Sequence, residues 1–391
     1  MTRHSFSRRA CISILATGLV TLASAPSTAG AASHATPTAP TFSIRGLGPP
    51  FFGDSYTPNG LNDTGTVAGT DPSGSVPQGF FFAKGTVHSV TPPTAMSGIS
   101  INGLNNADDV AAEGCFAAGC GTTRAYTGKV GATTIAWKSL PPPAGSSVCS
   151  ISGCDSSAAA IATNGYAVGQ YGGQATMWVP GSKPSYSAKR LPYTQASTFS
   201  SSSGTAADSF GDVAGVEERD LSTVGAFWPR KGAPVLLPAC QEVLVRGGAT
   251  FEKPLGLMAT GTTKTRTVTI VGQCLVESST DQTGFAPCLW VAKINGSATQ
   301  LSGPVRLDAN AGSDGGGAVA MNQKGWIVGN QGDATSSPTL WINRDAFLLS
   351  SLIPANSGWQ MDTLYAVNKK GQITGVGSNA GGTQAFLLTP R

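Results

Sequence analysis

Charged residues and histidine are scarce in this chain. Only 12% of its 391 residues are charged, and of its three His only His88 lies beyond the N-terminal segment. A Ser-His-acid triad would have to use His88, which we expect in an outer strand, and a zinc site needs several His or Cys ligands. We therefore expect no catalytic residues, no metal and no cofactor, and a protein that is not an enzyme.

Long apolar runs and helical patterns are missing as well. No window of 12 or more residues places apolar residues at helical spacing, and no run of the mature chain could span a membrane. Short apolar runs instead alternate with turns rich in Gly and Pro, of which the chain has 51 and 25. This alternation is typical of an all-β sandwich, barrel or propeller.

The N-terminus has the features of an export signal. Arg3, Arg8 and Arg9 precede the apolar run "ACISILATGLVTLASA", and Ala29-Gly30-Ala31 fits a cleavage site. We predict a signal peptide over 1–31 and a flexible tail over 32–40, with export by the Sec or the twin-arginine route. Cleavage would remove three of the 25 basic residues and none of the 21 acidic ones, which leaves a net charge of +1. So small a charge indicates no nucleic-acid partner and no anionic membrane surface.

Seven cysteines remain in the mature chain, and an exported protein uses cysteine mainly in disulfides. "CFAAGC" and "CSISGC" predict the short-loop bridges Cys115–Cys120 and Cys149–Cys154. A third bridge, Cys274–Cys288, would cross a hairpin and leave Cys240 free.

A nine-residue pattern, apolar–Asn–x–x–Gly–x–apolar–x–Gly, recurs along the chain. Its copies end at residues 69, 112, 169, 215, 272, 329 and 375, on average 51 residues apart. Copy two loses both glycines, copies three and four have Ala162 and Asp208 in place of Asn, and copy five has an expanded turn. After each copy comes an aromatic signature such as "ATMW" or "GAFW", and then an apolar run.

One repeat predicts four antiparallel strands. Asn at the first turn position can bond to the backbone two residues on, and Gly at the fourth can take a positive φ, which suits a tight hairpin. The aromatic signature supplies the third strand and the apolar run the fourth. A period near 50 residues is that of a propeller blade.

We predict a single seven-bladed β-propeller over 41–391. The expected blades are 51–95, 96–146, 152–196, 200–240, 251–303, 312–353, and 359–391 together with 41–48. The N-terminal strand at 41–48 would pair near Ala385–Leu388 and so remove the exposed edge of the last blade. An open solenoid is the alternative, but it would need capping repeats.

The repeat resembles the HAF repeat of bacterial extracellular proteins over almost all of residues 55–391. The His before Ala-Phe that gives that family its name is replaced here by Gly225, Asp345 and Gln384. The resemblance implies a repeat architecture and extracellular location, and it transfers no catalytic residue.

Three further patterns have simple structural interpretations. The acidic clusters at 108–109 and 216–220 are interpreted as solvated turns, and Trp178, Trp228, Trp290 and Trp341 as packing between blades. The best calcium candidate, Asp308, Asn310 and Asp314, has too few carboxylates.

Loop length suggests which face binds. The turns between the first and second strands are nearly uniform, whereas the connections on the opposite face vary in length, and binding concentrates in loops on rigid scaffolds. The hypothesis places ligand binding at Phe116, Arg124, Tyr171, Glu217 and Arg219 on that face. We expect a monomeric binding or structural module, secreted or periplasmic, for a glycan, peptide or surface polymer. The alternative is a propeller-type polysaccharide lyase or glycoside hydrolase.

Overall fold

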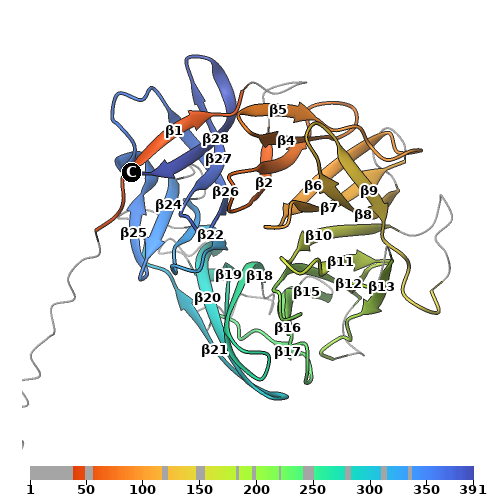
Figure 1. The fold of residues 1–391 in the computed structure, drawn as a ribbon. Coiled ribbons are helices and arrows are strands. Elements are labelled where there is room, and N and C mark those ends of the chain that lie inside the picture. Colours follow the sequence, from red (N-terminus) through yellow and green to blue (C-terminus); the bar gives the residue numbers. More distant parts are fainter. Residues whose placement is uncertain are drawn as a thin grey trace, which may run out of the picture. The chain divides into compact units, whose positions relative to one another are not determined.

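The computed structural model describes residues 38–48, 56–116, 122–146, 155–181, 185–195, 200–219, 222–240, 251–277, 283–309, 315–332 and 337–391. Within the unit Pro37–Arg391 these residues form seven four-stranded antiparallel sheets arranged in a ring (Figure 1). The protein is therefore all-β, a seven-bladed β-propeller, and the predicted fold is confirmed.

Blades 1 to 6 run outward from the centre of the ring in chain order, whereas the outermost strand of blade 7 is the N-terminal strand. Blades 1 to 3 consist of β2(Thr57–Leu61), β3(Val67–Asp71), β4(Gln78–Ala83) and β5(Thr86–Ser89); β6(Gly98–Leu104), β7(Asp109–Cys115), β8(Thr123–Val130) and β9(Ile135–Ser139); and β10(Ser156–Ile161), β11(Ala167–Tyr171), β12(Gln174–Pro180) and β13(Tyr186–Arg190). Blades 4 and 5 consist of β14(Ser201–Ala207), β15(Val213–Arg219), β16(Ser222–Trp228) and β17(Val235–Leu236); and β18(Glu252–Gly261), β19(Thr265–Glu277), β20(Thr283–Asn295) and β21(Ala298–Arg306).

Blades 6 and 7 complete the ring. They consist of β22(Gly316–Met321), β23(Ile327–Gln331), β24(Ser337–Ile342) and β25(Asp345–Leu348), followed by the 3₁₀ turn η1(Leu349–Leu352); and β26(Gln360–Val367), β27(Ile373–Asn379), β28(Gly382–Pro390) and β1(Phe42–Gly46). The first strands of neighbouring blades contact one another around the centre.

The N-terminal strand closes the ring as predicted. β1 pairs antiparallel with β28 from Phe42 opposite Pro390 to Gly46 opposite Phe386. Phe42 is fully buried in the core of the last blade, so closure covers a sheet edge and also contributes apolar contact.

The repeated turn has the predicted geometry. Its fourth residue has a positive φ, as at Gly65 (87°) and Gly371 (87°). In copy two Asp108 takes that place with φ 59°, a conformation that Asp tolerates better than most non-glycine residues.

The last Gly of the motif has a different role in the six copies that keep it. A Cβ at Gly169 would collide with the carbonyl oxygen of Ser157, beside an irregularity in the pairing of β10 with β11. The first strand thus approaches the second too closely for any side chain at this position.

The recurring tryptophans hold neighbouring blades together. Trp178 and Trp290 are fully buried, and their Nε1–H groups donate to the carbonyl oxygens of Pro141 (2.8 Å) and Pro238 (2.9 Å) of the preceding blades. Trp228 and Trp341 make the equivalent bonds to Pro192 and Asp308. The predicted packing role is confirmed, and the hydrogen bond shows why Trp rather than Phe stands there.

Candidate functional site

The first three positions of the repeat motif form three stacked layers at one mouth of the central channel. The apolar residue ends the first strand of its blade, the Asn begins the turn, and the next residue faces the opening. A cavity of about 310 Å³ is lined by all three layers. The apolar layer is Leu61, Leu104, Ile161, Ala207, Met321 and Val367; the middle layer is Asn105, Ala162, Asp208, Asn322 and Asn368; and the polar rim is Asp63, Asn106, Thr163, Ser209, Gln323 and Lys369.

The middle layer is buried and joins the blades. The Oδ1 of Asn105 accepts hydrogen bonds from the N–H groups of Ala107 (2.9 Å) and Asp109 (2.8 Å), which closes its own turn. Its Nδ2 donates to the carbonyl oxygen of Ala162 (2.8 Å), the equivalent position in the next blade.

The same amide relay occurs at three more blades. Asn322 donates to the Asn368 carbonyl (2.8 Å) and Asn368 to the Asn62 carbonyl (2.8 Å), whereas Asn62 donates to the Asp108 carboxylate (2.7 Å). Asn suits this position because its amide oxygen accepts from its own turn while its NH₂ group donates to the next one. The relay makes the channel mouth a preorganised frame.

Asp208 departs from this relay in blade 4. Its Oδ1 still accepts from the N–H groups of Phe210 and Asp212 (both 2.9 Å), but its buried Oδ2 has no hydrogen-bond partner in the described part of the chain. Burial, and secondarily the neighbouring Asp212 carboxylate, raise the pKa of Asp208 to about 7. A protonated Asp208 would regain the donor that Asn has in the other blades.

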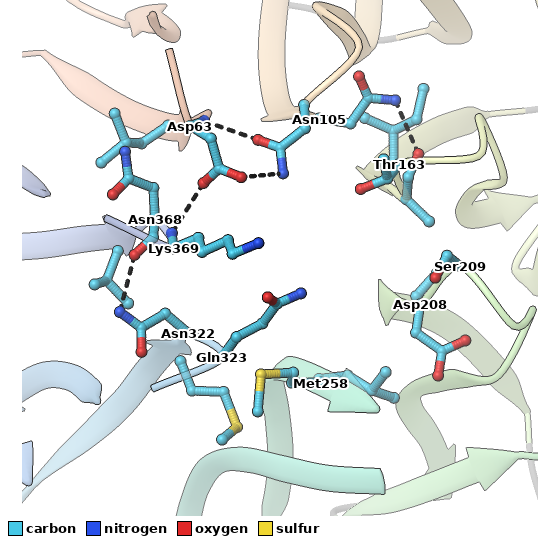
Figure 2. A pocket seen from close by; sticks show the side chains of 18 of the residues that line it. Asp63, Asn105, Thr163, Asp208, Ser209, Met258, Asn322, Gln323, Asn368 and Lys369 are labelled. Carbon is cyan, nitrogen blue, oxygen red and sulfur yellow. Dashed lines mark hydrogen bonds between the residues drawn. The ribbon is translucent and has the colours of Figure 1, made fainter. Parts of the chain in front are cut away.

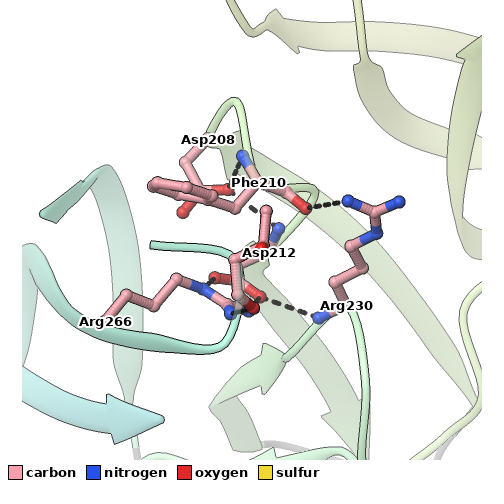
Figure 3. Close-up of polar contacts among 6 residues, drawn as sticks. Asp208, Phe210, Asp212, Arg230 and Arg266 are labelled. Atoms are coloured by element: carbon pink, nitrogen blue, oxygen red, sulfur yellow. Dashed lines mark hydrogen bonds and ion pairs between the residues drawn. The ribbon is translucent and has the colours of Figure 1, made fainter. Parts of the chain in front are cut away.

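A buried ion pair links blade 4 to blade 5 beside this site (Figure 3). The Arg266 guanidinium makes two hydrogen bonds to the Asp212 carboxylate, and it lies 5.5 Å from the ring centroid of Phe210. The N–H of Arg230 also donates to Asp212 (2.7 Å). The bond to Asp212 is the main cause of a raised Arg266 pKa. Blade 5 therefore replaces the Asn turn with a charged contact.

The polar rim presents hydrogen-bonding groups around an open centre (Figure 2). Asp63 and Asn106 bond reciprocally: the Asp63 N–H donates to the Asn106 Oδ1 (2.8 Å) and the Asn106 Nδ2 donates to the Asp63 carboxylate (2.8 Å). The Lys369 N–H donates to the other Asp63 oxygen (2.9 Å). Asp63 is thus oriented by its neighbours on both sides.

Lys369 and Gln323 extend toward the open centre (Figure 2). Both are exposed, and in the described ranges neither the Lys369 ammonium nor the Gln323 amide makes a hydrogen bond or ion pair. They are free to bind a ligand, whereas the Asp63–Asn106 pair offers a fixed acceptor and donor.

Blade 5 contributes no rim residue to this ring. Its first strand supplies Leu257, Met258 and Ala259 to the cavity wall instead. The site therefore has a polar rim from six blades, an apolar floor and one apolar side.

The residues predicted from loop length lie at the opposite ends of the strands. Phe116 and Arg124 come together, with the guanidinium 5.0 Å from the ring centroid. Tyr171 is 5% exposed and packs between blades 2 and 3. Glu217 is fully buried, and burial raises its pKa although it accepts hydrogen bonds from the Thr194 N–H and hydroxyl. Arg219, at the end of β15, is exposed.

Tyr171 and Glu217 therefore hold the scaffold and do not offer a free surface to a ligand. Both side chains are buried because they lie on the second strand of a blade, where it packs against the preceding blade. Loop length does not reveal this packing. None of the five residues predicted from loop length lines the channel-mouth cavity.

Sequence reasoning missed the polar rim. The turns looked too uniform to bind, yet their second position varies among Asp, Asn, Thr, Ser, Gln and Lys while the backbone stays constant. A variable polar residue at one position of a repeated turn was the feature of the sequence that could have indicated the rim.

Three other sets of candidate residues were predicted from the sequence: His88, the calcium ligands and the cysteines. His88, in β5, stacks on Phe81 with ring centroids 4.8 Å apart. Of the calcium candidates, Asn310 and Asp314 lie outside the described residues, as do Cys120, Cys149 and Cys154 and hence the two short-loop bridges. Cys240, Cys274 and Cys288 gather in one cluster, with Cys274 at bonding distance from both others.

Among the described residues, no helix has the length and apolar character needed to cross a membrane. Comparison of the chain with protein-family models gave no match, and comparison with curated proteins gave none.

Proposed function

We propose that this protein is a secreted, non-catalytic binding module that takes a neutral, hydroxyl-rich ligand, such as the end of a glycan chain, at the channel mouth formed by its repeated Asn turns. The observation that supports this most directly is the polar rim: amides, hydroxyls, one carboxylate and one ammonium face a single cavity from six blades. The export signal predicted over residues 1–31 and the resemblance to the HAF repeat of extracellular proteins support the location.

The chemistry of the rim favours a neutral polar ligand. Amide and hydroxyl side chains donate and accept hydrogen bonds without requiring a charged partner, and Asp63 and Lys369 balance each other in charge. The volume of about 310 Å³ is at the lower end of ligand pockets and suits a small unit such as one or two sugar rings. A frame fixed by the buried amides reduces the entropy lost on binding.

A peptide terminus is the second ligand class that the rim could accept, through Asp63 for an amine or Lys369 for a carboxylate. A polysaccharide lyase or glycoside hydrolase is the rival class. Glycan hydrolysis ordinarily uses two carboxyl groups facing the bond that is cleaved. At this mouth Asp63 is bonded to its neighbours and Asp208 is buried, so the arrangement favours binding over hydrolysis.

The test is a glycan array, followed by calorimetry on the best ligand and a depolymerase assay on the same glycans. Lys369→Ala and Gln323→Ala should each weaken binding about tenfold, which corresponds to about 1.4 kcal/mol. Lys370→Ala is the matched control. It also removes one positive charge, but the Lys370 side chain does not line the cavity.

The opposite face is tested with Arg124→Ala and Arg219→Ala. Binding that is lost in these variants but kept in Lys369→Ala would contradict the channel-mouth proposal and support the face chosen from loop length. Shortening of the bound glycan by the wild-type protein would contradict the non-catalytic part.

A further inference from the structure

Three cysteines from separate segments meet between blades 4 and 5. Cys240 follows β17, Cys274 lies in β19 and Cys288 in β20, and their sulfur atoms all lie within 4.8 Å of one another. Cys274 and Cys288 are fully buried in a cluster with Phe227 and Leu237 of blade 4, whereas Cys240 is partly exposed.

Cys274 is placed to bond with either neighbour. Its Cα lies 6.2 Å from that of Cys240 and 6.1 Å from that of Cys288, and both separations fall within the usual range for a disulfide, about 4.4–6.8 Å. Cys288 pairs with Gly272, two residues before Cys274, so both side chains point to the same face of the sheet. The sulfurs of Cys240 and Cys288 are 3.8 Å apart.

A sulfur atom can form only one disulfide, so three sulfurs yield one bridge and one thiol. We propose that Cys240, Cys274 and Cys288 form a thiol–disulfide exchange site in which Cys274 is the shared partner and the free thiol alternates between the partly exposed Cys240 and the buried Cys288. This inference does not depend on the proposed ligand site.

The step is an isomerisation that needs no external oxidant or reductant. The Cys240 thiol gives up its proton, and the thiolate attacks the Sγ of Cys274 in the Cys274–Cys288 bridge. The Cys240–Cys274 bond forms, the Cys274–Cys288 bond breaks, and Cys288 leaves as a thiolate that takes up a proton. The number of disulfides and thiols is unchanged.

The two forms differ in what they show to solvent. With the Cys274–Cys288 bridge, the partly exposed Cys240 thiol can form a mixed disulfide with a small disulfide or react with an electrophile. With the Cys240–Cys274 bridge, the remaining thiol is Cys288, which is fully buried. Cys240 is thus a modification site whose thiol is reactive in one form and bonded to Cys274 in the other.

The experiment is disulfide mapping of the full chain, unfolded and digested in acid to stop exchange. Untreated protein should yield both the Cys240–Cys274 and the Cys274–Cys288 peptides. Incubation of the folded protein with iodoacetamide should alkylate Cys240, and the Cys240–Cys274 peptide should disappear as exchange feeds the reactive form. Cys288→Ser should carry only the Cys240–Cys274 bridge and resist alkylation within the cluster.

Cys240→Ser is the matched variant, which should carry only the Cys274–Cys288 bridge and also resist alkylation in the cluster. The disulfide map of the wild-type protein tests the proposal even if a variant fails to fold. A single cluster bridge that persists unchanged under alkylation would overturn the proposal. So would a link from the third cysteine to Cys115, Cys120, Cys149 or Cys154, or three thiols isolated with stoichiometric zinc.

Discussion

The amide Nδ2 of Asn368 donates to the carbonyl oxygen of Asn62 at 2.8 Å, across 306 positions of sequence. This bond joins the last blade to the first at the channel mouth. It complements the pairing of β1 with β28, so the ring is closed both within blade 7 and between blades 7 and 1.

Asn368→Ala should destabilise the protein by about 1–3 kcal/mol, because it removes one of two donors to the Asn62 carbonyl, which keeps only the Gly65 N–H, and it leaves the Gln372 N–H without its acceptor. Chemical denaturation measures the loss. Lys370→Ala, two residues further on and exposed, should change stability by less than about 0.5 kcal/mol. Equal effects of the two substitutions would show that the amide relay does not stabilise the ring.

Asp208→Asn should make the protein more stable at pH 8 and leave its stability at pH 4 nearly unchanged. Burial raises the folded-state pKa of Asp208 from 3.8 to about 7, so between these values the folded protein holds a proton that the unfolded chain has lost. Wild-type stability therefore falls as the pH rises through this window, and Asn has no proton to lose.

The gain at pH 8 should be roughly 1–4 kcal/mol, measured by denaturation at several pH values. Some pH dependence should remain in the variant, because burial also raises the pKa of Glu252 to about 7. A variant whose stability curve is parallel to that of wild type at every pH would contradict the prediction.

Trp178→Phe should cost about 1–3 kcal/mol. The substitution leaves the Pro141 carbonyl without its donor and opens a small cavity between blades 2 and 3. Trp359→Phe is the control: Trp359 is half-buried against Phe386, and its Nε1 has no acceptor among the described residues. Thermal unfolding should separate the two variants clearly, with Trp359→Phe the milder.

Phe42→Ala should destabilise the protein by about 3–5 kcal/mol, since Phe42 is fully buried and anchors β1. Its neighbour Ser43 also lies in β1, but its hydroxyl makes only an exposed hydrogen bond to Thr389, so Ser43→Ala should have little effect. If Phe42→Ala unfolds at the same denaturant concentration as wild type, the closing strand does not anchor the ring.

The architecture followed from the sequence because each blade carries its own local signals. Asn at the turn and a buried Trp in the third strand each recur in four blades, and a residue with positive φ stands at the fourth turn position in all blades but blade 5. Each of these signals has a local physical cause. The turn forms in copy two even without Gly at position 108, because Asp108 adopts the required φ.

The candidate site could not be predicted from the sequence in the same way, because it depends on which side chains meet across blades. Glu217 stands among charged residues, which suggests a surface position. In the structure it is buried, paired with Ser202 in the sheet and hydrogen-bonded by Thr194. Cys240 is 34 positions from Cys274, and only the packing of blade 4 on blade 5 brings them together.

Ring closure by β1 has a consequence for the order of folding. Six blades are built from strands adjacent in the chain and can form as successive local meanders during synthesis. Blade 7 cannot, because Ser43 must find Thr389, 346 positions later. The first strand of the propeller can therefore pair only after the last strand has been synthesised. Pairing of β1 with β28 thus completes the ring only in a chain that extends through β28.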